Sequence, residues 1–382
     1  MANNSKTTSF FQNPPPLPPG RAQHHIVVLE AIHCVMPAFS FTHTIELHPR
    51  TDPAQVAERI KDATIVIACV VPVTPRDMDH APHLGMLAVM AVGLGWVDKD
   101  DCARRGVTVT NCVAGNVDAV AEHFLALYFA ARRQVVRVHN SVTASTEWRD
   151  QGTLTKAFWS GPPIGCGQET LGIMGYGALG QKIEKLARAV GFGEVLISER
   201  KNVGQIGNGN INTTTNTTTT TTTNTIRDGR VSFAEIIRQA TTICVCLPKE
   251  NDTVDLTAEP ELRAMRPDAL LINMARGGIV NEAALAKALR EGWIACAATD
   301  VLEIEPAWPG SGPLTPDLAK GEESAVPNLT ISSHIAWYTQ STIKNYQRLL
   351  KEGIEGWVAG SLQETPDQVN KVVVVHGGRI WR

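Results

Sequence analysis

Residues 168–201 read QETLGIMGYGALGQKIEKLARAVGFGEVLISERK, and this stretch decides the fold. An apolar run at 171–174 predicts a buried strand, and the apolar positions farther along recur at helical spacing. We expect Gly193 to end that helix and residues 195–198 to form a second strand. Between the first strand and the helix lies a G-x-G-x-x-G turn, made by Gly175, Gly177 and Gly180. The pattern is typical of the start of a parallel α/β unit.

This turn has the features of a dinucleotide site. The first glycine permits the tight turn, the second lets backbone approach a pyrophosphate, and the third lets helix and strand pack closely. The helix N-terminus then holds the diphosphate. Glu199 stands nineteen residues after Gly180, where a carboxylate accepts a hydrogen bond from a ribose 2′-OH. Arg200 and Lys201 follow and could receive a 2′-phosphate, so we expect NAD and leave NADP open.

Composition and charge restrict the classes of protein to consider. The 382 residues suffice for two domains, and 43% hydrophobic with 19% charged residues is typical of a globular chain. A net charge of −3 gives no electrostatic basis for a nucleic-acid or membrane partner. The sequence has no apolar run near the ~20 residues of a membrane span and no signal-peptide pattern. Its eight cysteines are scattered, so we expect a reduced, cytoplasmic protein without a metal site.

Predicted strands and helices alternate before and after residues 168–201, which indicates parallel sheets. Before this stretch, strands are expected at 26–30, 64–71, 87–92 and 107–111, and helices at 55–61, 98–105 and 116–133. After it, the alternation continues to residue 301 in doubly wound order. An amphipathic helix at 341–360 is expected to fold back onto the first domain.

Two segments break the alternation. Residues 1–23 are polar and then proline-rich, and residues 202–228 contain a run of Asn and Thr without periodicity. Because such segments bury little apolar surface, we expect both to be disordered. One domain is then expected at 24–124 with 335–382, and the other at 125–334.

Three segments place polar side chains at the ends of predicted strands, where parallel α/β folds bind ligands. Arg276 follows an apolar strand and precedes two glycines, which favours binding of a substrate carboxylate over an ordinary surface arginine. A lone histidine such as His334 is more often structural than catalytic. The acids after another strand, which taken alone are ordinary loop acids, are Asp300, Glu303 and Glu305.

Together these segments resemble the D-isomer-specific 2-hydroxyacid dehydrogenase family. The matching pieces are GYGALG, VAEHFLAL, ARGGIVNEAAL, the D-V-x-E-x-E-P segment and H-I-A, in the family's order over nearly the whole chain. HIAW and ISERK resemble its glycerate dehydrogenase/hydroxypyruvate reductase branch. The resemblance implies an α/β fold with two doubly wound domains, a Rossmann NAD-binding domain and a flavodoxin-like substrate-binding domain, with a cleft between them.

The family pattern implies roles for residues of this chain, position by position. Arg276 would anchor the substrate carboxylate, and Glu305 with His334 would form the catalytic pair. Val92 and Gly93 would offer backbone N–H groups to the substrate, which Arg276 and His334 would also contact. The implied cofactor-binding residues are Gly175, Gly177, Ala178, Leu179, Gly180, Glu199, Arg200, Leu247, Met274, Ala275, Arg276, Asp300 and His334.

The implied reaction is NAD(P)-dependent interconversion of small 2-keto acids and D-2-hydroxy acids, with hydroxypyruvate and glyoxylate as the first candidates. His334 would protonate the developing alkoxide while Glu305 holds its ring. One alternative is an NAD-sensing, corepressor-like binding protein of the same family. Another is a sibling enzyme for D-lactate, phosphoglycerate or formate, although the formate enzymes carry Gln where Glu305 stands.

The chain departs from the family pattern at two positions. Asn281 replaces the usual Asp after ARGxxV, and Ser333 replaces the usual Pro before the histidine. Both changes concern the fine positioning of the site rather than its chemistry. Residues 133–159 resemble the family's dimer arm, which implies a homodimer.

Overall fold

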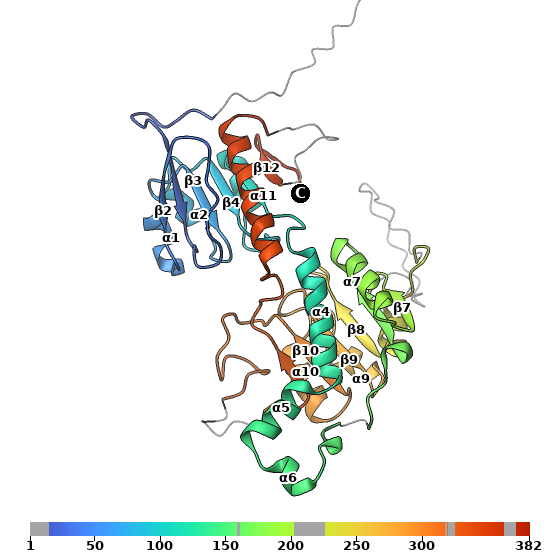
Figure 1. The fold of residues 1–382 in the computed structure, drawn as a ribbon. Coiled ribbons are helices and arrows are strands. Elements are labelled where there is room, and N and C mark those ends of the chain that lie inside the picture. The colour runs from blue at the N-terminus through green and yellow to red at the C-terminus, as the bar shows by residue number, and fades with distance from the viewer. Residues whose placement is uncertain (1–14, 159–160, 202–225, 318, 320–324, 363–371) are drawn as a thin grey trace, which may run out of the picture. The chain divides into compact units, whose positions relative to one another are not determined.

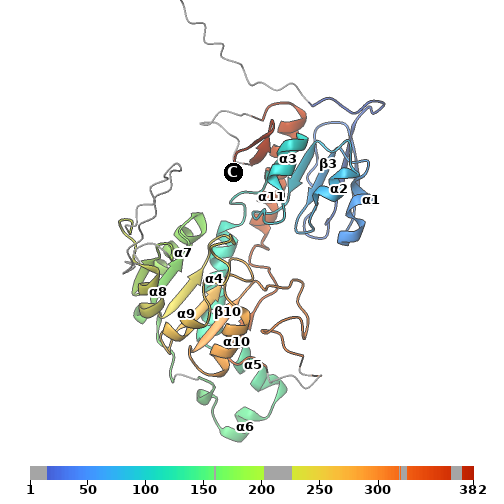
Figure 2. The ribbon, with the colours of Figure 1, turned by 180° about the vertical axis from the view of Figure 1, so that it is seen from behind.

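The computed structural model describes residues 15–158, 161–201, 226–317, 319, 325–362 and 372–382. The chain divides into two compact units, Met1–Asn116 with Tyr338–Arg382 and Val117–Trp337 (Figures 1 and 2). The first boundary between the units lies at 116/117, before the expected boundary at 124/125. The reason is that helix α4, Val117–Arg132, packs entirely within the second unit. Of the two segments predicted to be disordered, residues 1–14 and 202–225 lie outside the described residues.

The sheet of the first unit is parallel through five strands. These strands are β1 His24–Val28, β2 His43–Leu47, β3 Ile65–Ala68, β4 Met86–Val89 and β5 Thr108–Asn111. Their order, β2-β1-β3-β4-β5, is the flavodoxin-like order expected for this domain. Strand β12, Val373–His376, pairs antiparallel with β5, and β13, Arg379–Ile380, pairs antiparallel with β12. Strand β2, which was not predicted, is a largely exposed edge strand, and its two apolar side chains, Ile45 and Leu47, are not buried.

Among the described residues of this unit, four α-helices accompany the sheet. They are α1 Val56–Ile60, which continues a 3-10 turn at Pro53–Gln55, α2 Pro75–Asp79, α3 Lys99–Arg105 and α11 Gln340–Val358. The predicted helix at 341–360 is therefore α11, and it packs on the first unit as expected. Close approach explains two glycines here. A Cβ on Gly353 would lie 3.1 Å from Thr110 Oγ1, and a Cβ on Gly85 would lie 2.7 Å from the Trp357 ring.

The sheet of the second unit is parallel throughout. Its strands are β6 Thr170–Met174, β7 Glu194–Ile197, β8 Thr242–Val245, β9 Leu270–Asn273, β10 Cys296–Thr299 and β11 Leu329–Ile331. They lie in the order β11-β10-β9-β8-β6-β7. A parallel bridge between Ser198 and Val231 extends the pairing beyond β7. The chain therefore reverses its winding direction between β6 and β8, the point where doubly wound sheets bind ligands.

Helices cover both faces of this sheet. Figure 1 looks onto the face covered by α4 and α7, Ala178–Ala189, and Figure 2 looks onto the opposite face. The helices of that opposite face are α8 Phe233–Gln239, α9 Glu259–Ala264 and α10 Glu282–Arg290. Side chains alternate between the two layers: Ile243 and Val245 pack toward α8–α10, whereas Cys244 packs toward α4 and α7. The predicted α/β architecture is confirmed.

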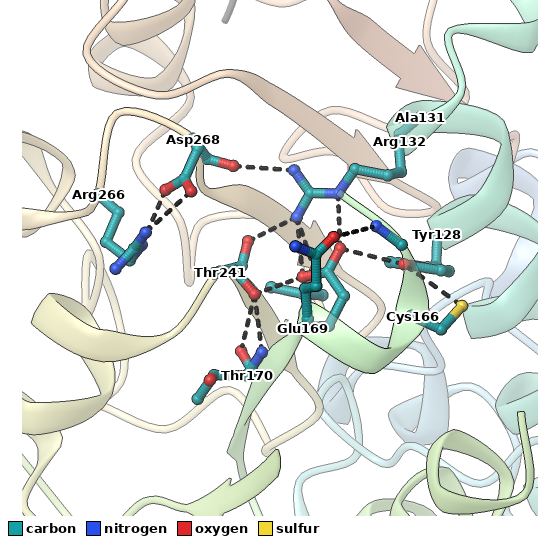
Figure 3. A network of polar contacts seen from close by, with 12 residues as sticks. Tyr128, Ala131, Arg132, Cys166, Glu169, Thr170, Thr241, Arg266 and Asp268 are labelled. Atoms are coloured by element: carbon teal, nitrogen blue, oxygen red, sulfur yellow. Dashed lines mark hydrogen bonds and ion pairs between the residues drawn. The ribbon is translucent and has the colours of Figure 1, made fainter. Parts of the chain in front are cut away.

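A buried ion pair fixes α4 to the end of the sheet where the strands begin (Figure 3). Arg132 Nε lies 2.7 Å from Glu169 Oε1, and the two side chains are 5% and 0% exposed. The same guanidinium donates to the carbonyl oxygens of Asp268 and Thr241, at 2.8 Å each. Glu169 precedes β6, Thr241 precedes β8 and Asp268 precedes β9. One arginine thus joins three strands to α4 at the end away from the glycine turn.

Among the described residues, none of the helices is both long and apolar enough to cross a bilayer.

Candidate active site

The glycine turn has the geometry that its sequence predicts. Gly175 adopts a φ of +101°, and a Cβ there would lie 2.8 Å from the carbonyl O of Cys246. A Cβ on Gly180 would overlap the carbonyl O of Gly175. In contrast, a Cβ on Gly177 would meet nothing within 4 Å. The first and third glycines therefore permit close packing, and the space beside the second is open to a ligand.

Helix α7 begins with donors that fit a diphosphate. Its N-cap is Gly177, which has no side chain to accept from the N–H groups of the first turn. Those donors and the positive end of the helix dipole suit an anion. The expectation that Gly193 ends this helix is wrong. The helix ends at Ala189, and Gly191, with φ +89°, provides the left-handed residue that follows it.

Glu199 follows β7, but its carboxylate is already paired. Arg227 Nε donates to Oε2 at 2.7 Å and Arg227 Nη2 donates to Oε1 at 2.6 Å. The Arg200 N–H adds a hydrogen bond of 3.0 Å, and the Glu199 side chain is 3% exposed. The hydrogen bonds from Arg227, acting against burial, lower the pKa of Glu199 to about 2. The sequence interpretation missed this partner because Arg227 lies in the stretch assigned to a disordered insertion.

The basic residues near Glu199 are not equivalent. The Arg200 side chain is exposed. Lys201 Nζ lies 2.9 Å from Glu261 Oε1 and donates to the Leu256 carbonyl, so its charge is compensated. Because of this pairing, Lys201 is a weaker candidate for a 2′-phosphate than the sequence suggested.

Leu247, Met274 and Ala275 stand at the carboxyl ends of β8 and β9. Leu247 lies beside the glycine turn, since a Cβ on Gly175 would be 2.9 Å from its Cβ. Met274 and Ala275 are buried. Asn273 fixes the backbone that follows β9, because its side chain accepts from the Ala275 N–H and donates to the Arg276 carbonyl, at 3.1 Å each.

Arg276 projects from this fixed turn. Its side chain is exposed, and Nη1 donates to the Ala275 carbonyl at 2.7 Å. The next residue, Gly277, lies against the Leu302–Glu303 backbone so closely that a Cβ would overlap it. The turn that carries Arg276 is therefore packed on the loop that carries Glu305.

His334 and Glu305 form a hydrogen-bonded pair. His334 Nδ1 lies 2.6 Å from Glu305 Oε2, and each side chain is 33% exposed. The Leu302 N–H donates to the other carboxylate oxygen at 2.7 Å. Burial opposes ionisation of Glu305, but the hydrogen bonds from His334 and Leu302 and the charges of His334 and Arg276 outweigh it. The pKa of Glu305 is consequently lowered. The structure thus brings together the three side chains that the sequence proposed as catalytic.

Asp300 holds the turn on which His334 stands. This buried carboxylate accepts from the Ile335 and Ala336 N–H groups at 3.0 Å each and from the Ser332 hydroxyl at 2.6 Å. The His334 N–H donates to the Asp300 carbonyl at 2.8 Å. His334 itself has a φ of +56°, a conformation that costs a side-chain-bearing residue energy. Asp300 therefore supports that conformation, and its place among the cofactor-binding residues stays a prediction.

Sequence reasoning missed two further residues of this region. His123 Nε2, on α4, lies 2.9 Å from Ser332 Oγ, which bonds to Asp300. Glu282 Oε1 accepts from the Glu303 N–H at 2.5 Å, and burial raises the pKa of Glu282. His123 belongs to the VAEHFLAL motif, so its place on a helix was visible, but its partner 209 positions away was not.

The remaining predicted positions have simple surroundings. Val92 and Gly93 follow β4 in the first unit, where Asn111 Nδ2 donates to the Val92 carbonyl at 2.8 Å. Asn281 is the N-cap of α10, and its Oδ1 accepts from the Ala284 N–H at 2.8 Å. Asn in place of Asp therefore preserves the cap. Ser333 is exposed. Within the described residues, no three His, Cys, Asp or Glu side chains gather as a metal site.

Comparison with models of known families identifies the family of this chain. The family described as D-isomer specific 2-hydroxyacid dehydrogenase, NAD binding domain, matches residues 125–336. The chain belongs to this family. The family predicted from the sequence motifs is thus confirmed. The prediction of an oxidoreductase with an NAD(P)-binding domain is confirmed as well.

Three relatives illustrate the likeness. A glycerate dehydrogenase of Methylorubrum extorquens is 31% identical over 335 residues, covering 87% of this chain and 95% of the relative. A glyoxylate reductase of Aeropyrum pernix is 31% identical over 301 residues, covering 78% of this chain and 79% of the relative. The solved structure of an NADPH-dependent glyoxylate/hydroxypyruvate reductase of Sinorhizobium meliloti, in complex with NADP and malonate, has a TM-score of 0.66 and 22% identity. It covers 88% of this chain and 94% of its own, which confirms the fold.

Proposed function

We propose that this protein uses NADH or NADPH to reduce small 2-keto acids such as hydroxypyruvate to D-2-hydroxy acids, and to reduce glyoxylate to glycolate. The observation that carries the proposal is the His334–Glu305 pair, 2.6 Å apart, whose Glu305 stands on a loop packed against the turn of Arg276. The names of the glycerate dehydrogenase and glyoxylate reductase relatives support this choice of substrates. The nicotinamide, when bound, supplies the hydride.

His334 is the proposed proton donor. Reduction of a ketone creates an alkoxide, which needs a proton from a group whose pKa lies near neutral pH. Imidazole is the side chain best suited to that task. Glu305 bonds to Nδ1, which leaves Nε2 as the nitrogen for the substrate. The lowered pKa of Glu305 keeps it ionised at neutral pH, so it stabilises the charged ring and fixes its orientation.

Arg276 is the proposed anchor for the substrate carboxylate. Its exposed guanidinium offers a planar pair of donors that matches a carboxylate. We propose that the N–H groups of Val92 and Gly93, which belong to the first unit, donate hydrogen bonds to the substrate. The first unit is accordingly the proposed substrate-binding domain. The second unit is proposed to bind the cofactor through the glycine turn and through Leu247, Met274 and Ala275.

The test uses purified protein with hydroxypyruvate, glyoxylate, pyruvate and a branched 2-keto acid, each with NADH and with NADPH. Cofactor oxidation is followed by absorbance for the wild type and for His334→Ala. We expect turnover with hydroxypyruvate and glyoxylate and a loss of about 100-fold or more in the variant. Turnover that survives in His334→Ala, or no turnover despite cofactor binding, would refute the proposal.

We further propose that the protein is a homodimer joined through residues 133–158, and that it acts in the cytoplasm. This arm contains α5, Val135–Ala144, and α6, Glu147–Gln151, and α5 has no buried residue. Its exposed apolar side chains are Val135, Val136, Val142 and Trp148. Such a surface favours a partner. Light scattering of the wild type and of Val136→Asp measures the mass: a monomeric wild type would contradict the proposal.

A further inference from the structure

The end of strand β7 is joined to a segment that returns from beyond the Asn/Thr-rich stretch. The Glu199 N–H donates to the Val231 carbonyl at 2.8 Å, and the Val231 N–H donates to the Ile197 carbonyl at 2.9 Å. This backbone pairing holds residues 226–231 beside the carboxyl end of β7. It is the reason that Arg227, which is 28 positions from Glu199 in sequence, reaches its carboxylate.

The Glu199 carboxylate has no free capacity in this arrangement. It accepts from Arg227 Nε, Nη2 and the Arg227 N–H, and from the Arg200 N–H. Four hydrogen bonds match the roughly four acceptor positions of a carboxylate. A ribose hydroxyl carries no charge and donates one hydrogen bond, so replacing Arg227 by it would lose the ion pair and the two parallel N–H···O bonds of the guanidinium. A ribose 2′-OH therefore gains little by replacing Arg227.

The same pair leaves a cationic surface beside the glycine turn. Arg227 is 60% exposed, and within the described part of the chain its guanidinium gives Nε and one N–H of Nη2 to the Glu199 carboxylate. Arg200 is exposed, and Arg230 donates to the Ser198 carbonyl while its guanidinium lies 5.8 Å from the Tyr176 ring centre, within the turn itself. The adjoining acid, Asp228, is exposed, so solvent screens its charge. Planar guanidinium groups are suited to phosphate.

We propose that Arg227 determines the cofactor specificity of this protein, favouring a dinucleotide with a 2′-phosphate, NADP(H), over NAD(H). Arg227 neutralises the acid that would bind the 2′-OH and presents its remaining donors to the phosphate together with Arg200. This inference rests on the proposed function for the identity of the bound dinucleotide. It reverses the expectation that Glu199 favours NAD.

The experiment measures dissociation constants of NADH and NADPH by fluorescence titration of the full chain, at one fixed ionic strength and without substrate. The variants are Arg227→Ala and, as a matched control, Arg238→Ala, which removes an exposed arginine from the last turn of α8. Arg227→Lys, which retains the charge but not the two-pronged bond, is the second variant. Thermal unfolding checks that each variant is folded.

We expect the wild type to bind NADPH at least 10-fold more tightly than NADH. Arg227→Ala should weaken NADPH by about 10- to 100-fold, as for the loss of one charged hydrogen-bond partner, and should tighten NADH because Glu199 is freed. Arg227→Lys should fall between, and Arg238→Ala should change neither.

A wild type that binds NADH as tightly as NADPH would overturn the inference, as would equal weakening of both cofactors in Arg227→Ala. The proposed function fails separately: NADPH preference that depends on Arg227, without reduction of any 2-keto acid, would refute the reductase while leaving the specificity residue in place. Binding of neither cofactor would refute both.

Discussion

Replacing Arg132 by Met tests what holds α4 on the second unit (Figure 3). The substitution keeps a long side chain but leaves the Glu169 carboxylate, which is 0% exposed, without its cation. It also removes the donor from the carbonyls of Asp268 and Thr241. Three hydroxyl groups still donate to Glu169, those of Tyr128, Thr241 and Thr242.

The expected cost follows from this burial. Breaking a fully buried pair from one side costs about 3–5 kcal/mol, since the remaining charge has no water. The three hydroxyls keep the value within that range rather than above it. For a folded unit of roughly 150–250 residues, each kcal/mol lowers the melting temperature by about 2–4 °C, so the transition should fall by about 6–20 °C.

Scanning calorimetry measures this transition in the full chain. The matched control is Lys182→Met, because Lys182 Nζ lies 2.6 Å from Asp118 Oδ1 in a pair whose side chains are 33% and 66% exposed. Exposed pairs contribute about 0–1 kcal/mol, so this control should shift the transition little. The double variant Arg132→Met/Glu169→Met should recover much of the loss, because no buried charge remains. Equal shifts for Arg132→Met and Lys182→Met would refute the reasoning.

Three further predictions concern the site. Glu305→Gln should lower kcat about 100-fold with a small change in KM, because we propose that its pair with His334 acts in the proton transfer; steady-state kinetics that show only a KM effect would contradict this. The pKa of Glu199 is lowered from 4.5 to about 2 in the folded chain. The stability that the ionised carboxylate gives to the folded chain is therefore present above pH 4.5 and is lost as the pH falls toward 2. Denaturant titrations at several pH values should therefore show that the difference in unfolding free energy between the wild type and Glu199→Gln shrinks as the pH falls from 4.5 toward 2. A difference that stays constant over this range would contradict the lowered pKa of Glu199. Asn281→Ala should cost about 0.5–2 kcal/mol of unfolding free energy, because its bond to the Ala284 N–H caps α10, whereas Asn281→Asp should restore the cap.

Much of the candidate site could be predicted from local patterns. Arg276, Glu305 and His334 each follow a strand of a parallel sheet, and such ends meet at one edge, so their proximity followed from the alternation. The end of α7 was misplaced because two glycines, Gly191 and Gly193, stand within one turn of each other. Both suit a helix end, and only the backbone shows which one takes the left-handed conformation.

The sequence by itself determined the α/β class, the glycine turn and the residue types of the site, because periodicity and turn chemistry act over a few residues. Only the tertiary structure decided the partners of the buried carboxylates. Glu199 meets Arg227, Asp300 meets the Ser332 hydroxyl, and each pairing spans about 30 positions. A buried charge must be compensated, but many residues could do so, and the choice depends on which segments the folded sheet brings together.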